Sequence, residues 1–376
     1  MNNSANLNPL AIGEGQRVRL SIVILNWNGV DMMRRFLPSV VQNSPEADVV
    51  VVDNGSTDDS LVWLESAMPQ VRIVKLDRNY GFAEGYHRGL KALEEDSSRL
   101  PLKGEGRYYL LLNSDVEVCE GWLQPMIAYM DAHPEVAACQ PKLLCQWSPE
   151  YFEYAGASGG FIDAYGYPYC RGRVFSTVEK DEGQYDDVAS ILWATGAALL
   201  IRSADYWAVG GLDGRFFAHQ EEIDLCWRLR SHGRGVVVVP QSVAYHLGGG
   251  TLPQGNPRKD YLNFRNNLLL LYKNLPEEHL AKVFRIRLWL DALASLKFLL
   301  TGHLRSFLAV WRAYRDFRRM RPDFEKDRKE NLRLATVTPI PEQSTFSLLW
   351  QYYVKGRKTF DKLPTPPPIP SRVRGV

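Results

Sequence analysis

The sequence of 376 residues lacks the features that mark several common classes of protein. Its five cysteines, Cys119, Cys139, Cys145, Cys170 and Cys226, form no C-x-x-C pair, which argues against a zinc site or a disulfide framework and suits a reducing cytosol. It has no run of 18 apolar residues and no basic-then-apolar start, so neither a transmembrane helix nor a signal peptide is expected. A formal net charge of only +2 gives no indication of a nucleic-acid partner.

Two nucleotide-binding motifs are also missing. No G-x-G-x-x-G and no G-x-x-x-x-G-K-[ST] follows any of the strands predicted below, which excludes the usual dinucleotide and P-loop sites. A hydrophobic content of 45% and a charged content of 23% are ordinary for a soluble globular protein. The length allows one large domain and an appendage.

Short apolar runs alternate with helical patterns over the first third of the chain. Runs of this kind, bounded by polar residues, are typical of buried strands in a parallel sheet, and alternation with helices predicts an α/β fold. Ligands in such folds bind beyond the carboxyl ends of the strands. The predicted strands cover residues 18–27, 49–52, 71–74 and 109–112, and a further short piece covers 116–118.

Polar groups stand at these strand ends. Asp115, in the group Asn113-Ser114-Asp115, is placed to hold a divalent cation that bridges phosphates, although Asn, Ser and Asp also favour ordinary turns. Asp53 follows a second buried strand, where its carboxylate could accept the N–H of a uracil or thymine ring or could simply stabilise a turn.

The middle of the chain, residues 140–195, is rich in glycine and aromatic residues. It predicts loops and short strands rather than a long helix. Its aromatic rings could stack on sugars, or they could pack a loop-rich subdomain.

Three acids open a predicted helix in the segment FFAHQEEIDLCWRLR. Glu221, Glu222 and Asp224 suit the positive end of the helix dipole, but like charges this close also raise a pKa, which suits a general base. His246 ends a later strand, directly before Gly248-Gly249-Gly250-Thr251, where it could ligate a metal beside a mobile lid or be structural.

Taken together, these motifs resemble those of the inverting family 2 glycosyltransferases of the GT-A fold, especially rhamnosyltransferase-like members. The matching text is SIVILNWNG, VVVDNGSTDDS, NYGFAEGYHRGL, LLNSDVEV, WATGAALLIR, GGLDGRFFAHQEEIDLCWRLR, YHLGGGT and YLNFRNNLLL, over about residues 18 to 275. The resemblance implies that Glu222 is the base and that Asp115 and His246 hold Mg²⁺ or Mn²⁺. It also implies that Arg265 and Asn266 lie near the acceptor or diphosphate. The residues implied to form the nucleotide-sugar site are Asn26, Asn28, Asp53, Asn79, Gly81, Gly85, Asn113 and Asp115.

The sequence departs from that family pattern at two positions. The first acid of the D-x-D motif is Asn113, and the second acid of the catalytic pair is Glu222 rather than Asp, so Glu221 and Asp224 stay open as alternatives for the base. An inverting transfer by single displacement needs one carboxylate base and one cation, and the motifs supply both.

The resemblance alone suggests dTDP-rhamnose as donor, with a UDP-sugar also open, and a saccharide or polyprenyl-diphosphate lipid as acceptor in cell-surface polysaccharide synthesis. Two other functions compete with this prediction. A sugar-1-phosphate nucleotidyltransferase would carry a Gly/Arg-rich loop after its first strand, where this chain has Asn26-Trp27-Asn28-Gly29. A non-catalytic, membrane-docked sugar-binding protein would not need the acid cluster.

The predicted organisation has four parts. Residues 1–16 form a loose tail, 17–278 the catalytic domain, 279–335 a basic amphipathic helical region, and 336–376 an extension with a Pro-rich end. Residues 281–330 carry 13 Lys or Arg against 6 Asp or Glu. Such helices often lie on anionic membranes, which would place the protein at the inner face of the cell membrane; the alternative is a helix packed on the catalytic domain with its basic face in water.

Overall fold

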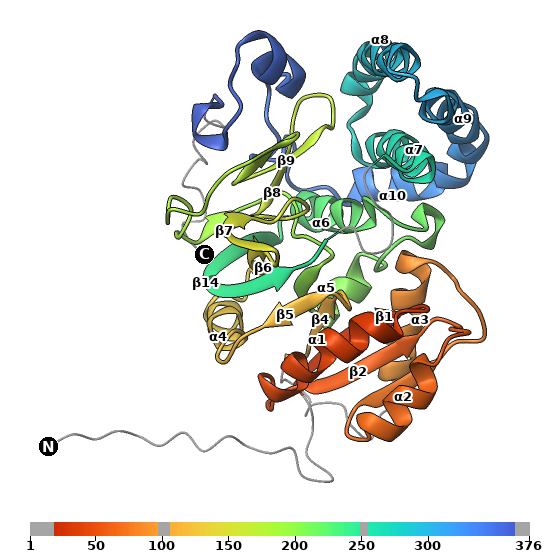
Figure 1. Cartoon of the computed structure of the whole chain (residues 1–376). Coiled ribbons are helices and arrows are strands. Elements are labelled where there is room, and N and C mark those ends of the chain that lie inside the picture. The colour runs from red at the N-terminus through yellow and green to blue at the C-terminus, as the bar shows by residue number, and fades with distance from the viewer. Residues whose placement is uncertain (1–18, 97–105, 249–254, 365–376) are drawn as a thin grey trace, which may run out of the picture.

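The N-terminal part of the chain folds as alternating strands and helices, as predicted (Figure 1). A computed structural model describes residues 19–96, 106–248 and 255–364, so the predicted N-terminal tail, most of the glycine segment after His246 and the Pro-rich end lie outside the described residues. The first elements are β1 (Leu20–Asn26), α1 (Val30–Gln42), β2 (Asp48–Asp53), α2 (Ser60–Ala67), β3 (Arg72–Lys75), α3 (Phe82–Glu95), β4 (Tyr108–Leu112), β5 (Val116–Val118) and α4 (Gln124–Ala132).

These strands belong to a ten-stranded sheet with the order β12-β14-β6-β13-β4-β1-β2-β3, to which β5 and β7 add at β14 and β6. β1 pairs in parallel with β2 and β4, and β2 with β3, so this part of the sheet is parallel as predicted. β13 runs antiparallel between β4 and β6, which makes the whole sheet mixed. The additional strands are β6 (Val136–Cys145), β7 (Ser148–Phe152), β12 (Ala189–Ser190), β13 (Ala198–Arg202) and β14 (Gly235–His246).

Apolar side chains cover both faces of the sheet because successive residues of a strand point to opposite sides. In β2, Val50 and Val52 pack with Tyr86 of α3 in one cluster of buried residues. Val49 and Val51 belong to a second cluster, together with buried residues of α1. Runs without polar alternation therefore mark strands that are buried on both faces.

The parallel register brings the polar strand ends to one edge of the sheet. Asn26 at the end of β1 stands opposite Asp53 at the end of β2. β4 ends at Leu112, directly before Asn113, and His246 at the end of β14 pairs with Val116 of β5. This edge is where ligands are expected to bind.

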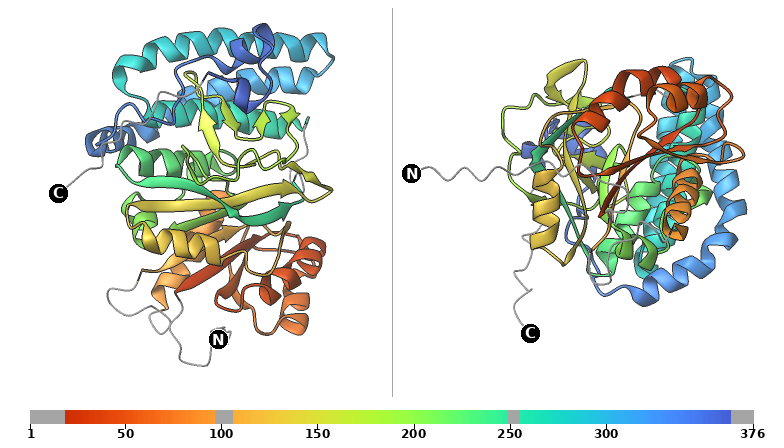
Figure 2. Two further views of the ribbon diagram at one scale, coloured as in Figure 1. Left: turned by 90° about the vertical axis from the view of Figure 1, so that its left-hand side faces the viewer. Right: turned by 90° about the horizontal axis from the view of Figure 1, so that it is seen from below.

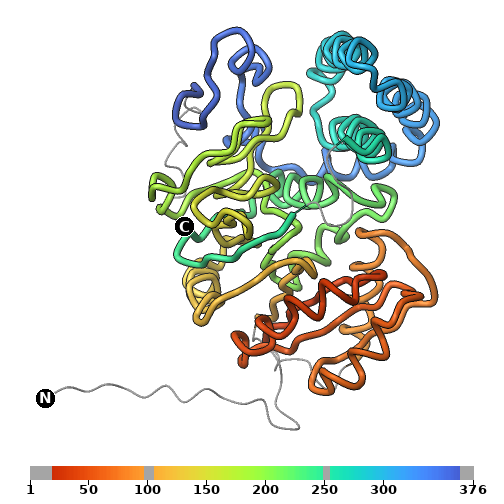
Figure 3. Tube along the Cα trace, viewed as in Figure 1, coloured from red at the N-terminus to blue at the C-terminus, as the bar shows by residue number. Residues whose placement is uncertain are grey.

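The glycine- and aromatic-rich middle forms a second, small sheet with the order β11-β10-β9-β8. Several of its aromatic rings are buried: Phe161 packs against Tyr169, and both Tyr169 and Tyr185 pack against Phe360. Trp147 and Tyr154 are exposed. The C-terminal segment returns to this region, where Gln343 pairs with Ile162 (Figure 3). The strands are β8 (Gly160–Ile162), β9 (Pro168–Cys170), β10 (Arg173–Val174) and β11 (Thr177–Val178).

A layer of helices covers the end of the molecule opposite α1 and α2 (Figure 2). Among the described residues, no helix combines the length and the apolar content needed to cross a bilayer. The helical elements of this half are α5 (Ser203–Ala208), η2 (Gly214–Phe216), α6 (Glu221–Ser231), α7 (Pro257–Asn274), α8 (Glu277–Leu300), α9 (Leu304–Met320), η3 (Arg321–Phe324), α10 (Glu325–Leu334), η4 (Trp350–Val354) and η5 (Phe360–Lys362).

The two long helices of the appendage bury different kinds of residue. α9 buries residues such as Val310 and Phe317 and exposes arginines. α8 buries the polar residues Arg287, Asp291 and Ser295 and exposes apolar ones. The buried polar stripe of α8 packs against α9 and the segment around Tyr165 and Tyr167, and nothing in the sequence indicates this contact.

Candidate active site

Three of the predicted nucleotide-binding residues lie together at the ends of β1 and β2. The amide of Asn26 donates to Asp53 Oδ1 (3.2 Å) and to Ser56 Oγ (3.1 Å). Asp53 Oδ2 accepts from the backbone N–H of Ser56 (3.1 Å), so Asp53 stabilises a turn as well as facing the strand end. Asn28 has a φ of 51°, and its side-chain oxygen accepts from Thr57 N (2.7 Å). Hydrogen bonds among these side chains and the turn at Ser56 and Thr57 therefore fix Asn26, Asn28 and Asp53 in place before any ligand binds.

A second group joins this strand end to α3. Asn79 accepts from the amide of Asn54 (3.2 Å) and from the backbone N–H of Gly81 (2.8 Å). Gly81 has a φ of 81°, and a Cβ there would lie 2.5 Å from the ring of Phe217. A Cβ at Gly85 would lie 2.9 Å from Leu25. Close packing and the positive φ thus require glycine at position 81, whereas a Cβ at position 85 would only displace the end of the Leu25 side chain.

The predicted metal ligands Asp115 and His246 contact each other. His246 Nε2 lies 3.1 Å from Asp115 Oδ1 and 3.4 Å from the amide nitrogen of Asn113. On the other side of the ring, His246 Nδ1 lies 3.2 Å from Glu153 Oε1. All three of the groups Asp115, Glu153 and His246 are largely buried.

The two carboxylates control the charge of this histidine. Burial disfavours a charged imidazole, but Glu153 and Asp115 outweigh burial and raise the pKa of His246 to about 10. For Asp115, burial raises the pKa, and the hydrogen bond and charge of His246 outweigh it, so its pKa falls below the ordinary value. Without a cation, the site is therefore an imidazolium between two carboxylates.

The chemistry of the pair fits a divalent cation, because a carboxylate oxygen and an imidazole nitrogen can both be ligands of such an ion. The 3.1 Å between Asp115 Oδ1 and His246 Nε2 is a hydrogen-bond distance, and an ion held by both groups would replace the proton between them. Glu153 would hold the proton on Nδ1 and turn Nε2 toward the ion. Across the described ranges, no three His, Cys, Asp or Glu side chains are grouped to hold a metal by protein alone. Mg²⁺ is commonly bound by one or two carboxylates together with substrate phosphates, and Asp115 supplies one carboxylate.

The three acids of α6 occupy different environments. Asp224 is fully buried, and its carboxylate accepts from Arg228 (3.0 Å), Lys273 (2.8 Å) and Asn274 (2.8 Å). Burial raises its pKa, but Arg228 and Lys273 lower the pKa below its ordinary value. Asp224 is thus a fixed anion in a buried ion network, which favours a structural role.

Glu221 and Glu222 each have a buried carboxylate oxygen without a hydrogen-bond partner among the described residues. Burial raises the pKa of Glu222 to about 7. Burial and the neighbouring charge of Glu222 raise the pKa of Glu221 well above its ordinary value. Glu222 is also the more accessible of the two, and its Cβ lies beside Gly196, next to the Ala197 carbonyl that accepts from Asn113 N (3.0 Å). Glu222 therefore has the properties of a base at the sheet edge.

The acids follow a strained segment. Phe217, His219 and Gln220 have φ values of 66°, 71° and 71°, which non-glycine residues rarely adopt. The backbone carbonyl of Phe217 accepts from Phe82 N (2.7 Å) and Ala83 N (3.2 Å) and so joins this segment to the start of α3.

Arg265 and Asn266 hold the same segment from the other side. Asn266 Nδ2 lies within hydrogen-bond distance of the carbonyls of Phe216 (3.0 Å), Ala218 (2.8 Å) and His219 (2.7 Å), which share its two hydrogens. Arg265 donates to the Phe216 carbonyl (2.7 Å). The sequence predicts these two side chains near the acceptor or diphosphate. Their contacts in the structure are with the strained backbone, which favours a positioning role.

Residues 21–176 match the family described as glycosyl transferase family 2. This part of the chain is a family 2 glycosyltransferase domain. One similar protein is the N-acetylglucosaminyl-diphospho-decaprenol L-rhamnosyltransferase of Mycobacterium tuberculosis, which is 25% identical over 60% of this chain and 75% of its own length. Another is the rhamnosyltransferase WbbL of Escherichia coli, which is 23% identical over 60% of this chain and 82% of its own length.

Solved structures of low sequence identity share the fold of this transferase. S. aureus TarS 1-349 in complex with UDP-GlcNAc superposes with a TM-score of 0.50 and 15% identity, covering 84% of this chain and 89% of that one. GalNAc-T7 with UDP, GalNAc and Mn²⁺ has a TM-score of 0.50 and 16% identity, covering 68% of this chain and 48% of that one. The predicted GT-A fold is confirmed by this likeness.

Sequence reasoning did not find Glu153 or Asn54 in the site of this transferase. Glu153 lies in the irregular segment after β7, where no motif or spacing relates it to His246. Asn54 directly follows Asp53, and the polar excess of the D-N-G-S turn was the signal that could have identified it.

Proposed function

We propose that this glycosyltransferase moves a sugar from a nucleoside-diphosphate donor to a saccharide or lipid-linked acceptor, with inversion at the anomeric carbon. The proposal rests on two groups at the same edge of the sheet. Asp115 and His246, 3.1 Å apart, are side chains that can bind a metal ion. Glu222 is a carboxylate whose pKa lies near neutrality. The first group suits the diphosphate, and the second suits the acceptor hydroxyl.

In the proposed reaction Glu222 is the base. The acceptor hydroxyl gives its proton to Glu222 as its oxygen attacks the anomeric carbon, while the bond from that carbon to the diphosphate oxygen breaks. Glu221 stays protonated because burial and the charge of Glu222 raise its pKa, so it adds no second negative charge. Asp115 and His246 would hold a Mg²⁺ or Mn²⁺ ion, which stabilises the charge on the departing nucleoside diphosphate.

For the substrates, we propose dTDP-rhamnose as donor and a polyprenyl-diphosphate-linked saccharide as acceptor. The proposal is supported by the names of two similar proteins, a decaprenol-linked L-rhamnosyltransferase and the rhamnosyltransferase WbbL. An O-antigen biosynthesis protein of Myxococcus xanthus, 25% identical over 65% of this chain, supports a role in cell-surface polysaccharide synthesis, although the match covers only 18% of that protein. A lipid-linked acceptor would place the reaction at the cytoplasmic face of the cell membrane.

The test is a transfer assay with dTDP-rhamnose and UDP-sugars on a diphosphate-linked N-acetylglucosamine acceptor, with and without Mn²⁺. We expect transfer that depends on the cation, a product with the opposite anomeric configuration to the donor, and no transfer by Glu222→Gln. Retention of configuration, or full activity of Glu222→Gln, would refute the proposed mechanism. Activity with UDP-sugars alone would change the donor and keep the mechanism.

A further inference from the structure

The outward side of α8 and α9 carries apolar side chains that nothing in the described structure covers. On α8, Trp289, Leu293 and Leu300 are 75%, 61% and 78% exposed. Because helical residues three or four apart share a face, residues 289, 293, 296 and 300 form one stripe. A similar stripe on α9 begins at Leu304, just after the end of α8. The exposed apolar residues of the two helices are Leu288, Trp289, Leu293, Leu296, Leu299, Leu300, Leu304, Leu308 and Trp311.

The orientation of α8 is fixed by polar contacts on its buried side. Asp291 accepts from the hydroxyl groups of Tyr167 (3.1 Å) and Tyr314 (2.8 Å) and pairs with Arg287 (3.2 Å). Arg287 also donates to the Tyr165 carbonyl (2.9 Å). Rotating α8 to bury its leucines would break these bonds and leave buried charges unpaired, which is costly. The apolar stripe therefore belongs to the outer surface of the folded chain.

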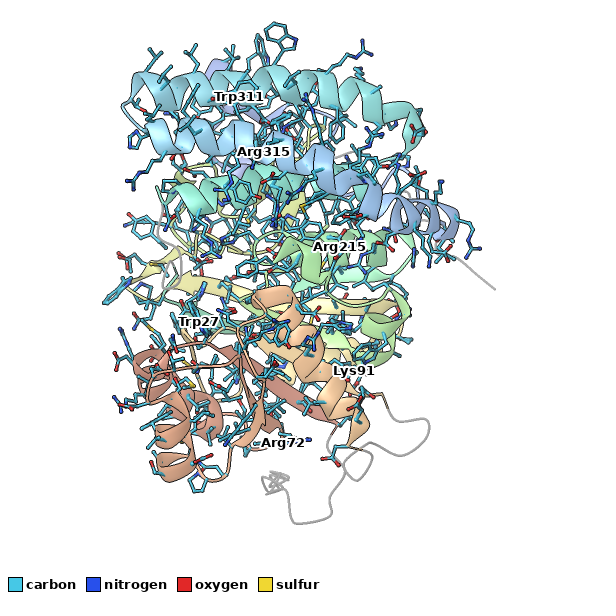
Figure 4. All side chains as sticks on the ribbon, turned by 90° about the vertical axis from the view of Figure 1, so that its right-hand side faces the viewer. Trp27, Arg72, Lys91, Arg215, Trp311 and Arg315 are labelled. Atoms are coloured by element: carbon cyan, nitrogen blue, oxygen red, sulfur yellow. The ribbon has the colours of Figure 1, made fainter. Side chains whose placement is uncertain are left out.

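Positive charge surrounds the stripes. Lys282, Arg285, Lys297 and Arg305 are exposed on the same two helices. The carboxylates between residues 279 and 320 are Asp291 and Asp316, and both are buried. Figure 4 shows Trp311 and Arg315 in this helical layer. Apolar residues with tryptophan, bordered by lysine and arginine, match the interface of a bilayer with anionic headgroups.

We propose that the outer face of α8 and α9 docks on the surface of an anionic lipid bilayer. This docking rests on the proposed function, because a lipid-linked acceptor would be presented to the enzyme at the bilayer surface. A second copy of the chain fits the face less well, since a two-fold contact would bring the cationic border of one copy against the same border of the other. The proposal makes the membrane contact expected from the sequence more specific: the apolar stripe of α8 inserts, and the basic residues surround it.

The test is co-sedimentation of the full chain with vesicles of phosphatidylcholine alone or with 30% phosphatidylglycerol. We expect binding to the anionic vesicles that weakens with salt. The variant Trp289→Ser/Leu293→Ser/Leu300→Ser is expected to lose at least tenfold in partition coefficient, and Arg285→Glu/Lys297→Glu/Arg305→Glu is expected to lose its preference for anionic vesicles. A matched control, Val62→Ser/Val354→Ser, removes exposed apolar residues outside α8 and α9 and is expected to bind like the wild type.

Equal vesicle binding by the wild type and the triple serine variant would overturn the proposal. So would a wild-type dimer that becomes monomeric in this variant without any lipid binding, as measured by sedimentation velocity. Lipid binding that appears only after deletion of residues 365–376 would show that the chain covers its own face, and would also overturn it. Transfer to a water-soluble acceptor separates the two proposals. The triple serine variant is expected to keep the kcat/KM of the wild type with this acceptor. If neither the wild type nor the variants transferred sugar, the proposed function would be contradicted, and the measured vesicle binding would still support docking on the bilayer.

Discussion

Replacing Glu222 by Gln is expected to stabilise the fold while it abolishes transfer. The side chain carries a buried oxygen without a partner among the described residues, and burial raises its pKa to about 7. An acid with a raised folded-state pKa opposes folding once it ionises in the unfolded chain. The cost is absent below the unfolded pKa of about 4.5, grows between pH 4.5 and 7, and is complete above about pH 7.

The size of this effect follows from the shift. A pKa shift from 4.5 to about 7 corresponds to about 3 kcal/mol at pH 8, and this is an upper limit because Glu222 is partly accessible to water. For a chain of this length, about 3 kcal/mol corresponds to a rise in Tm of about 4 °C. Because a neutral amide has no ionised form to desolvate, Glu222→Gln is expected to recover most of this difference at pH 8 and none of it at pH 4.

The measurement is Tm by calorimetry of the wild type and Glu222→Gln from pH 4 to pH 8, together with kcat. We expect a Tm difference that grows with pH and a loss of kcat of about 10²–10⁴-fold, as is usual for a missing general base. Glu221→Gln is the matched control, because a neutral amide imitates the protonated acid, and it is expected to keep kcat within about tenfold. A Tm difference independent of pH, or a larger loss of kcat in Glu221→Gln, would refute the assignment of the base.

The remaining predictions concern the buried ion network, the metal pair and the strained segment. Asp224→Asn is expected to lower the free energy of unfolding by about 3 kcal/mol in urea titrations, because the buried Arg228 loses its anion and Lys273 keeps only Asp213; unchanged stability would reopen Asp224 as the base. Glu153→Gln is expected to weaken Mn²⁺ binding about 10–100-fold by isothermal titration calorimetry, since Nδ1 of the histidine loses its carboxylate; wild-type affinity would argue against this orientation. Because the imidazolium must lose a proton to bind a cation and its pKa is raised to about 10, Mn²⁺ affinity is expected to rise about tenfold per pH unit between pH 6 and 8, and an affinity independent of pH would contradict ligation by the ring. Asn266→Ala is expected to lower kcat more than it raises KM, because the segment before the acids loses the amide that its three carbonyls share; a change in KM alone would favour direct contact with substrate.

The sheet and its ligand-binding edge could be predicted because each depends on local pattern. Apolar runs such as Val49–Val52 are buried on both faces, and the residue after a parallel strand must lie at the carboxyl edge. The contact between Asp115 and His246 was also predicted, although only through resemblance, since 131 positions separate them in the chain.

Two features of the structure depend on tertiary packing and could not be predicted from the sequence pattern. The resemblance named Glu222 as the base and left Glu221 and Asp224 open, and the positions of Arg228, Lys273 and Asn274 distinguish Asp224 from the other two acids. The buried side of α8 was missed for a similar reason. Its polar stripe is satisfied by Tyr167 and Tyr314, which lie 124 and 23 positions from Asp291, and periodicity carries no information about such partners.

The Phe217 carbonyl has a mechanical consequence for the catalytic cycle. Because it accepts from the first two N–H groups of α3, the segment that leads to Glu222 is fastened to the same helix that packs behind the nucleotide-side strands. Moving the half of the site that would hold the donor away from the half that carries the base would leave these two N–H groups without a partner, because the first N–H groups of a helix have none within the helix. A motion that keeps the two halves together costs less, so we expect the start of α3 and the segment before Glu222 to move as one unit.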